Sequence, residues 1–165
     1  MVTGPDGLRL AAYRFGGAGS PLVLAHATGF HAHVWLPWLG ALRERFTVYA
    51  WDLRGHGESG RPGDLEAYRY EALGRDLLAV ADRFGLGRVF AIGHSVGGAV
   101  VVQTEVLRPG TVARAVLFEP IILPPGVTAP TQRVAAAERR RRVFASTAEM
   151  LERWAGRPPF ASFDP

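Results

Sequence analysis

The order of apolar and polar positions along the chain predicts an alternation of strands and helices. Short, continuous apolar runs between glycine-rich or polar stretches are typical of strands buried in a sheet. The runs expected to form strands span residues 8–15, 21–25, 46–51, 88–92 and 113–118. The segments expected to be helical span 34–45, 69–84 and 99–107. Strands and helices that alternate with short connections favour an α/β fold, with a mostly parallel sheet and flanking helices.

The segment 69–84 has the clearest helical spacing. Its apolar residues recur at intervals of three and four and form one stripe, made of Leu73, Leu77, Val80, Ala81 and Phe84. Gly85 and Gly87 follow directly and are expected to end this helix before the next strand.

The pattern changes after Pro120. Three prolines between residues 121 and 130, with Pro120 just before them, exclude a regular element there, and 131–145 is an arginine-rich, helix-forming segment. The sequence Ser146-Thr147-Ala148-Glu149 fits a capping box for a short helix to Trp154, which Gly156 ends. We therefore expect one unit over 1–120 and the beginning of a second, helical unit over 121–165.

Composition narrows the class of protein. The chain has 165 residues, of which 48% are hydrophobic and 21% charged, as in a globular domain. No apolar run reaches the roughly 20 residues of a membrane helix, so we expect no membrane partner. The chain has no cysteine, which excludes disulfides and thiolate metal sites and favours a cytoplasmic location.

The positive charge does not indicate a nucleic-acid partner. All 19 basic residues are arginine, and the net charge is +4. The single dense run, Arg139 to Arg142, is interpreted as a solvated helix face or as the edge of a site for an acidic substrate. We expect a small-molecule substrate.

Candidate chemistry is concentrated in residues 93–98, which read Gly-His-Ser-Val-Gly-Gly. An apolar strand precedes them and a helix follows, and a G-x-S-x-G motif between a strand and a helix is a nucleophile elbow. This motif holds its serine on a sharp turn at a helix N-terminus, so the hydroxyl is exposed. It makes Ser95 the candidate nucleophile, flanked by glycines because a side chain there would collide with the neighbouring strand or helix.

A serine nucleophile also needs hydrogen-bond donors for the oxyanion that forms. The N–H of Val96 is one donor, and the second is expected from the loop that follows an earlier strand. That loop reads His26-Ala27-Thr28-Gly29-Phe30. Thr28 is the first choice for the second donor, with Ala27 and Gly29 as alternatives.

Three motifs together resemble the N-terminal part of an α/β-hydrolase fold protein. They are His-Ala-Thr-Gly at 26–29, Asp-Leu-Arg-Gly-His-Gly-Glu-Ser at 52–59, and Gly-His-Ser-Val-Gly-Gly at 93–98. The resemblance covers residues 8–120 and extends loosely into the arginine-rich segment, which is similar to the start of a helical cap. Ala27 stands where the family usually has glycine, which requires that its φ stay negative.

The resemblance implies a serine hydrolase with Ser95 as nucleophile and Val96 and Thr28 as oxyanion donors. In this family the acid and the histidine of the triad follow the serine, and the strands that ordinarily carry them lie beyond this sequence. We therefore expect an incomplete core that is catalytically inert and marginally folded by itself. Glu119, at the end of the strand after the elbow helix, is the candidate acid present.

All five histidines precede Ser95, so none is expected to act as the general base. His26 and His56 are expected to bond to loop backbone, and His94 to point away from the nucleophile's side of the chain. Asp52 is expected to brace its loop with Arg54 as partner.

Phe30 and His31 are expected at the substrate pocket, with His33 also placed at its mouth. No cofactor and no metal are expected. The oligomeric state remains open.

The sequence is compatible with two hypotheses for the function and argues against a third. The first is an esterase with an acyl-enzyme mechanism, or a thioesterase, lactonase or cofactor-free peroxidase on the same scaffold. The second is a non-catalytic binding module. The third, a dinucleotide-binding domain, fails because the glycines lack the G-x-G-x-x-G spacing after the first strand.

Overall fold

The computed structural model describes residues 1–122, 141, 143–157 and 161. The chain divides into two compact units, Met1–Ile122 and Leu123–Pro165. The interpretation of the second unit as the start of a helical cap remains a prediction. The expected irregular segment 121–130 lies almost entirely outside the described residues, as does nearly all of the expected helix 131–145.

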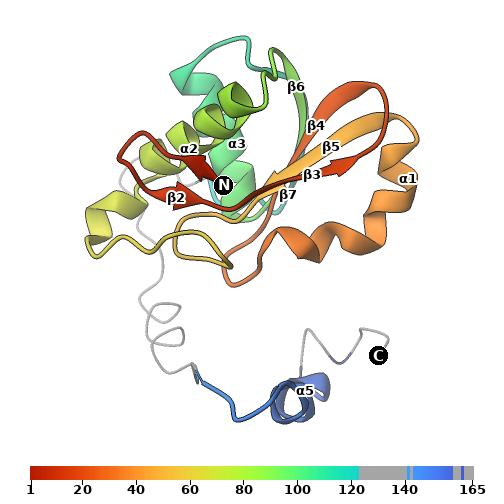
Figure 1. Cartoon of the computed structure of the whole chain (residues 1–165), viewed down its shortest axis with the longest axis vertical. Coiled ribbons are helices and arrows are strands. Elements are labelled where there is room, and N and C mark those ends of the chain that lie inside the picture. Colours follow the sequence, from red (N-terminus) through yellow and green to blue (C-terminus); the bar gives the residue numbers. More distant parts are fainter. Residues whose placement is uncertain (123–140, 142, 158–160, 162–165) are drawn as a thin grey trace. The chain divides into compact units, whose positions relative to one another are not determined.

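A five-stranded sheet forms the centre of the first unit (Figure 1). Its strand order is β3-β5-β4-β6-β7. The strands are β3 (Ala12–Gly16), β4 (Ser20–Ala25), β5 (Phe46–Trp51), β6 (Val89–His94) and β7 (Val112–Phe118). Only β3 pairs antiparallel, and the other four strands are parallel, which confirms the α/β fold with a mostly parallel sheet.

Helices cover both faces of the sheet (Figure 1). On one face lie α2 (Tyr70–Arg83) and α3 (Val96–Leu107), which pack on Val23, Trp51 and Val89. On the other lie the 3₁₀ helix η1 (Ala32–Trp38) and α1 (Leu39–Arg43), over Leu24 and Val48. A further 3₁₀ helix, η2 (Leu65–Tyr68), precedes α2.

The expected strand 8–15 is two strands. β2 (Arg9–Leu10) pairs with β1 (Val2–Thr3), while β3 joins the main sheet. The change of partner occurs at Ala11, whose N–H donates to the Ser59 hydroxyl at 2.9 Å and whose carbonyl accepts the N–H of Asp52 at 2.8 Å.

The expected helix 34–45 is also divided, into η1 and α1. Pro37 lies inside η1. It has no N–H to donate, and its ring would collide with the carbonyl four residues earlier in an α-helix. The segment therefore turns as a 3₁₀ helix up to Trp38.

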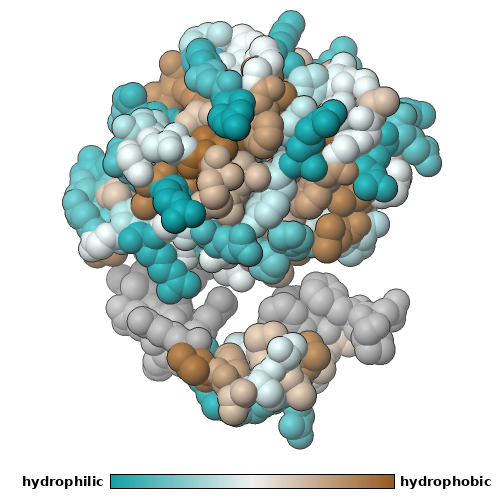
Figure 2. All heavy atoms as spheres, in the orientation of Figure 1, coloured by the Kyte–Doolittle hydropathy of each residue, from teal (hydrophilic) through white to brown (hydrophobic). Residues whose placement is uncertain are grey.

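The expectation that 113–118 is a buried strand is wrong about burial. β7 is an edge of the described sheet, and Val116 and Phe118 are 54% and 46% exposed. Hydrophobic residues, brown in Figure 2, reach the surface of the first unit among hydrophilic ones, which are teal.

In the second unit, the described part contains helix α5 (Thr147–Ala155). One half of the expected capping box is present, because the Ser146 hydroxyl accepts the N–H of Glu149 at 3.1 Å. The carboxylate of Glu149 accepts the N–H of Ala145 at 2.7 Å. No helix in the described part of the chain is long and apolar enough to cross a membrane.

Candidate active site

Ser95 lies on the sharp turn between β6 and α3. Its backbone has φ 54° and ψ −116°, a conformation that residues other than glycine rarely adopt and that costs on the order of 1–3 kcal/mol. The turn is held by the Ser95 carbonyl, which accepts the N–H groups of Gly98 at 3.0 Å and Ala99 at 3.3 Å. This geometry is that of the expected elbow.

The glycines of the motif are required by space. A Cβ on Gly93 would lie 2.7 Å from the carbonyl oxygen of Gly97. On Gly97 it would lie 2.2 Å from the carbonyl oxygen of Ala25, and on Gly98 it would lie 2.8 Å from Pro120. Gly93 and Gly97 therefore let α3 approach β6 and β4 more closely than any side chain allows.

The same close approach brings the elbow to the loop after β4. Ala25 pairs with Gly93 across the two parallel strands. A Cβ on Gly97 would also lie 2.8 Å from the carbonyl oxygen of His26. The loop that contains Thr28 therefore begins directly against the N-terminus of α3, where Val96 lies.

The two amides assigned to the oxyanion are free within the described part of the chain, where neither Thr28 nor Val96 donates a backbone hydrogen bond. Ala27 is not among the described residues with positive φ, so alanine fits where the family usually has glycine. The oxyanion assignment itself remains a prediction.

His26 is completely buried and bonded at both ring nitrogens. Its Nε2 accepts the N–H of Leu53 at 2.9 Å, and its Nδ1 lies 2.9 Å from the carbonyl oxygen of Ala27. Burial lowers the pKa of His26 to about 4, so the ring is neutral near pH 7. These contacts agree with the expected bonds to backbone.

Asp52 braces the loop that follows β5. One of its carboxylate oxygens accepts the N–H of Ala32 at 2.7 Å, and the other accepts the N–H of Glu58 at 2.9 Å and the hydroxyl of Tyr13 at 3.1 Å. Burial is the main reason that the pKa of Tyr13 rises to about 12, with Asp52 adding to the effect.

The expected pairing of Asp52 with Arg54 is wrong. Arg54 is buried and makes a two-point ion pair with Asp76 of α2, through Nε at 2.7 Å and Nη2 at 2.6 Å. Its Nη1 also donates to Asp6 at 2.9 Å. The carboxylate of Asp76 raises the pKa of Arg54, so the guanidinium stays charged. Burial raises the pKa of Asp76, and Arg54 opposes that rise.

The aromatic residues expected near the substrate pocket make two separate sets of contacts. Phe30 and His94 lie side by side, with ring centroids 6.5 Å apart. His31 is exposed and its ring lies 5.4 Å from that of His33, which in turn lies edge-on to Tyr13 at 4.8 Å. The pocket roles of Phe30 and His31 remain predictions. All five histidines are described, and none hydrogen-bonds to Ser95 within the described residues.

Glu119 lies within a segment that is bonded to Ser95 on both sides. The N–H of Ser95 donates to the carbonyl of Phe118 at 2.9 Å, and the N–H of Ile121 donates to the carbonyl of Ser95 at 3.2 Å. Glu119 is exposed and has φ 43°. The backbone of the candidate acid is thus tied to the nucleophile, while its catalytic role remains a prediction.

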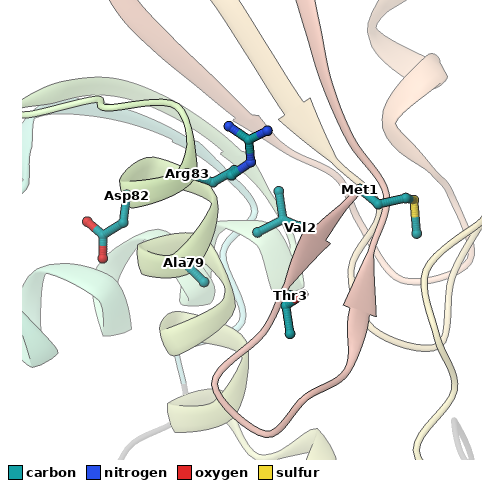
Figure 3. A pocket seen from close by; sticks show the side chains of 6 residues that line it. All are labelled: Met1, Val2, Thr3, Ala79, Asp82 and Arg83. Carbon is teal, nitrogen blue, oxygen red and sulfur yellow. The ribbon is translucent and has the colours of Figure 1, made fainter.

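Two surface cavities lie away from this site. One, of about 480 Å³, is formed by the first strand and α2 and is lined by Met1, Val2, Thr3, Ala79, Asp82 and Arg83 (Figure 3). The other, of about 300 Å³, is mostly apolar and includes Phe46, Phe90 and Val116. Within the described residues, no cluster of three or more histidines and carboxylates could hold a metal ion.

Two contacts of the site were missed by sequence reasoning. The Tyr13–Asp52 bond spans 39 residues and the Arg54–Asp76 pair spans 22. For the second there was a signal: Asp76 lies beside Leu77 on the apolar stripe of α2, and a buried carboxylate requires a partner.

Comparison with known proteins places the chain in a family. The alpha/beta hydrolase family matches residues 22–165, and the chain belongs to this family. Epoxide hydrolase A of Mycobacterium tuberculosis is 35% identical over 129 residues, which are 77% of this chain and 40% of that protein. The chain spans about a third of the length of the curated relatives it matches.

Solved structures of hydrolases are similar to this chain in fold. A hydrolase from Pseudomonas aeruginosa PA01 is 29% identical with a TM-score of 0.73, over 94% of this chain and 57% of that one. The esterase RhEst1 from Rhodococcus sp. ECU1013 is 31% identical with a TM-score of 0.66, over 73% of this chain and 45% of that one.

Proposed function

We propose that the chain supplies the nucleophile and oxyanion hole of a serine hydrolase that acts on a carboxylic ester or a related small acyl substrate. The observation that carries this proposal is the positive φ of Ser95 at the N-terminus of α3, directly against the loop that contains Thr28. The similarity to the esterase RhEst1 supports an ester as substrate.

In the proposed reaction, Ser95 Oγ bonds to the carbonyl carbon of the substrate while its proton passes to a base. The carbonyl oxygen takes the electron pair and accepts hydrogen bonds from the N–H groups of Val96 and Thr28. The bond to the alcohol then breaks, the alcohol leaves with the proton, and an acyl ester remains on Ser95. Water repeats the sequence on this ester, releasing the carboxylic acid and restoring the serine.

The general base is not one of the five histidines. His26 is committed to Leu53 and Ala27 at both ring nitrogens, and His94 lies against Phe30. We therefore propose that the chain alone does not turn over esters at enzymatic rates. Glu119 is the proposed acid of the triad, and Phe30 and His31 are proposed to line the substrate pocket. We also propose a cytoplasmic location, which the absence of cysteine supports.

Chemical rescue tests this proposal. A fluorophosphonate should label Ser95 slowly in the chain alone and much faster with added imidazole, which supplies the missing base. Labelling should map to Ser95 by mass spectrometry and be lost in Ser95→Ala, while the exposed helix-capping Ser146 serves as an internal reference. Labelling of Ser95 that is no faster than that of Ser146, with or without imidazole, contradicts the proposal and favours a non-catalytic binding module.

The similarity to epoxide hydrolase A raises epoxides as a second class of substrate. Opening an epoxide by the hydroxyl of Ser95 would form an alkyl ether to the enzyme, and water does not readily cleave an ether. An acyl ester on Ser95 can be hydrolysed, so the residue at the elbow favours esters. With added imidazole, an activated ester should therefore transfer its acyl group to Ser95, detected by mass spectrometry, whereas a simple epoxide should leave Ser95 unmodified; an alkyl adduct on Ser95 and no acyl adduct would contradict the preference for esters.

A further inference from the structure

The loop that contains Thr28 is attached to the core at its two ends. At the beginning, His26 Nε2 accepts the N–H of Leu53 at 2.9 Å, and at the end the N–H of Ala32 donates to Asp52 at 2.7 Å. Asp52 and Leu53 are consecutive residues directly after the end of β5. Thr28 lies between the two attachments and is exposed, so its position depends on the ends.

The attachment at His26 needs one particular protonation state. Because the N–H of Leu53 donates to Nε2, this nitrogen carries no hydrogen, and Nδ1 then donates to the carbonyl of Ala27. A second proton, on Nε2, would point directly at the N–H of Leu53. The protonated ring is therefore disfavoured in this position.

The groups around the ring oppose that proton. His26 is 0% exposed, and burial lowers its pKa to about 4. The carbonyl of Ala27 and the carboxylate of Asp52 favour the charged ring, whereas His56, with its ring centroid 5.3 Å away, and His31 oppose it. From α3, the neighbouring residue is Gly97, which has no charge.

We infer that His26 is a positioning residue whose protonation releases the Leu53 end of the loop, so that the Thr28 amide is held in place only while the ring is neutral. The role of Thr28 in this inference depends on the proposed function. The attachment of the loop to Leu53 is independent of the proposed function.

Linkage gives the direction and size of the effect. In the closed loop His26 protonates near pH 4, whereas in an opened loop the ring protonates near its ordinary pKa of 6.5. The attachment is therefore fully effective above pH 6.5 and is lost as the pH falls toward 4. Within this window, the equilibrium constant for opening should rise by up to about tenfold for each unit by which the pH falls.

Hydrogen exchange of the chain tests this directly. After correction for intrinsic exchange, the amide of Leu53 and the hydrogen-bonded loop amide of Phe30 should open about fortyfold more at pH 4.5 than at pH 6.5, and amides of α2 should change much less. His26→Gln keeps an acceptor near the position of Nε2 and cannot titrate, so its loop should show no such slope. His33→Gln, which changes a histidine directly after the same loop, should keep the slope of the unmodified chain.

Two results overturn the inference: a loop slope no steeper than that of α2, or a slope that persists in His26→Gln. If His26→Gln does not fold, the inference is still tested by comparing the pH dependence of amide exchange in the loop and in α2 of the unmodified chain. The measurement makes no use of the chemistry of Ser95. Failure of fluorophosphonate labelling would therefore remove the proposed function without changing this result.

Discussion

At the scale of single residues, Ser95 and the glycines around it hold conformations that their neighbours impose. Ser95 keeps φ 54° although a side chain disfavours it. Replacing Ser95 with glycine should relieve this strain and raise the free energy of unfolding by about 1 kcal/mol. Ser95→Ala keeps the Cβ and should leave stability nearly unchanged. Denaturant titration of both variants measures the difference, and equal stabilities would show that the turn is not strained.

Gly97 is the residue on which the close approach of α3 to β4 depends. Gly97→Ala places a Cβ 2.2 Å from the carbonyl oxygen of Ala25, so the helix must shift. We expect a loss of about 3 kcal/mol or more in the free energy of unfolding. Gly40→Ala is the matched control: Gly40 also lies in a helix, a Cβ there meets nothing within 4 Å, and the change should be slightly stabilising. Equal changes in the free energy of unfolding for the two substitutions would contradict the close packing of α3 against β4 at Gly97.

At the scale of elements, the ion pair of Arg54 and Asp76 joins the loop after β5 to α2. Both side chains are buried, so Asp76→Ala leaves the guanidinium with the partly exposed Asp6 as its remaining carboxylate partner. We expect a loss of about 3 kcal/mol in thermal or denaturant unfolding. Glu71→Ala removes a pair of the same helix whose members are more than half exposed, and should cost less than about 0.5 kcal/mol. A small effect of Asp76→Ala would show that the pair does not stabilise this junction.

Elements with strong local signals could be predicted from the sequence, and those fixed by distant partners could not. The predicted helix 69–84 matches α2 (Tyr70–Arg83) because its apolar stripe is long, and 46–51 matches β5. The pairing of the two-residue β1 and β2 carries almost no periodic signal. The nucleophile elbow could be predicted from the sequence because the close approach of its helix requires three glycines. The partner of Arg54 could not be predicted, because the position of Asp76 on the apolar stripe indicates that it needs a partner but not which residue supplies it.

At the scale of the whole molecule, the two edges of the described sheet differ. β3 is interrupted by a shift of register between Arg14 and Gly16, a feature that discourages pairing with another chain. β7 also has a register shift, between Val112 and Arg114 at its beginning, but from Arg114 to Phe118 it pairs without interruption, and Arg114 is its only charged residue.

We therefore expect the chain to associate through β7 at high concentration. Val116→Lys should reduce this association in sedimentation velocity, while Val34→Lys, a change of another exposed valine, should not. Equal behaviour of the two variants would exclude β7 as the contact.

The central claim is that Ser95 presents its hydroxyl to two amide donors. The crystal structure of the chain after reaction with a fluorophosphonate tests it most directly. The account predicts a phosphonyl oxygen within about 2.7–3.1 Å of the backbone nitrogens of both Val96 and Thr28. An adduct on Ser95 whose oxygen contacts neither nitrogen would contradict it.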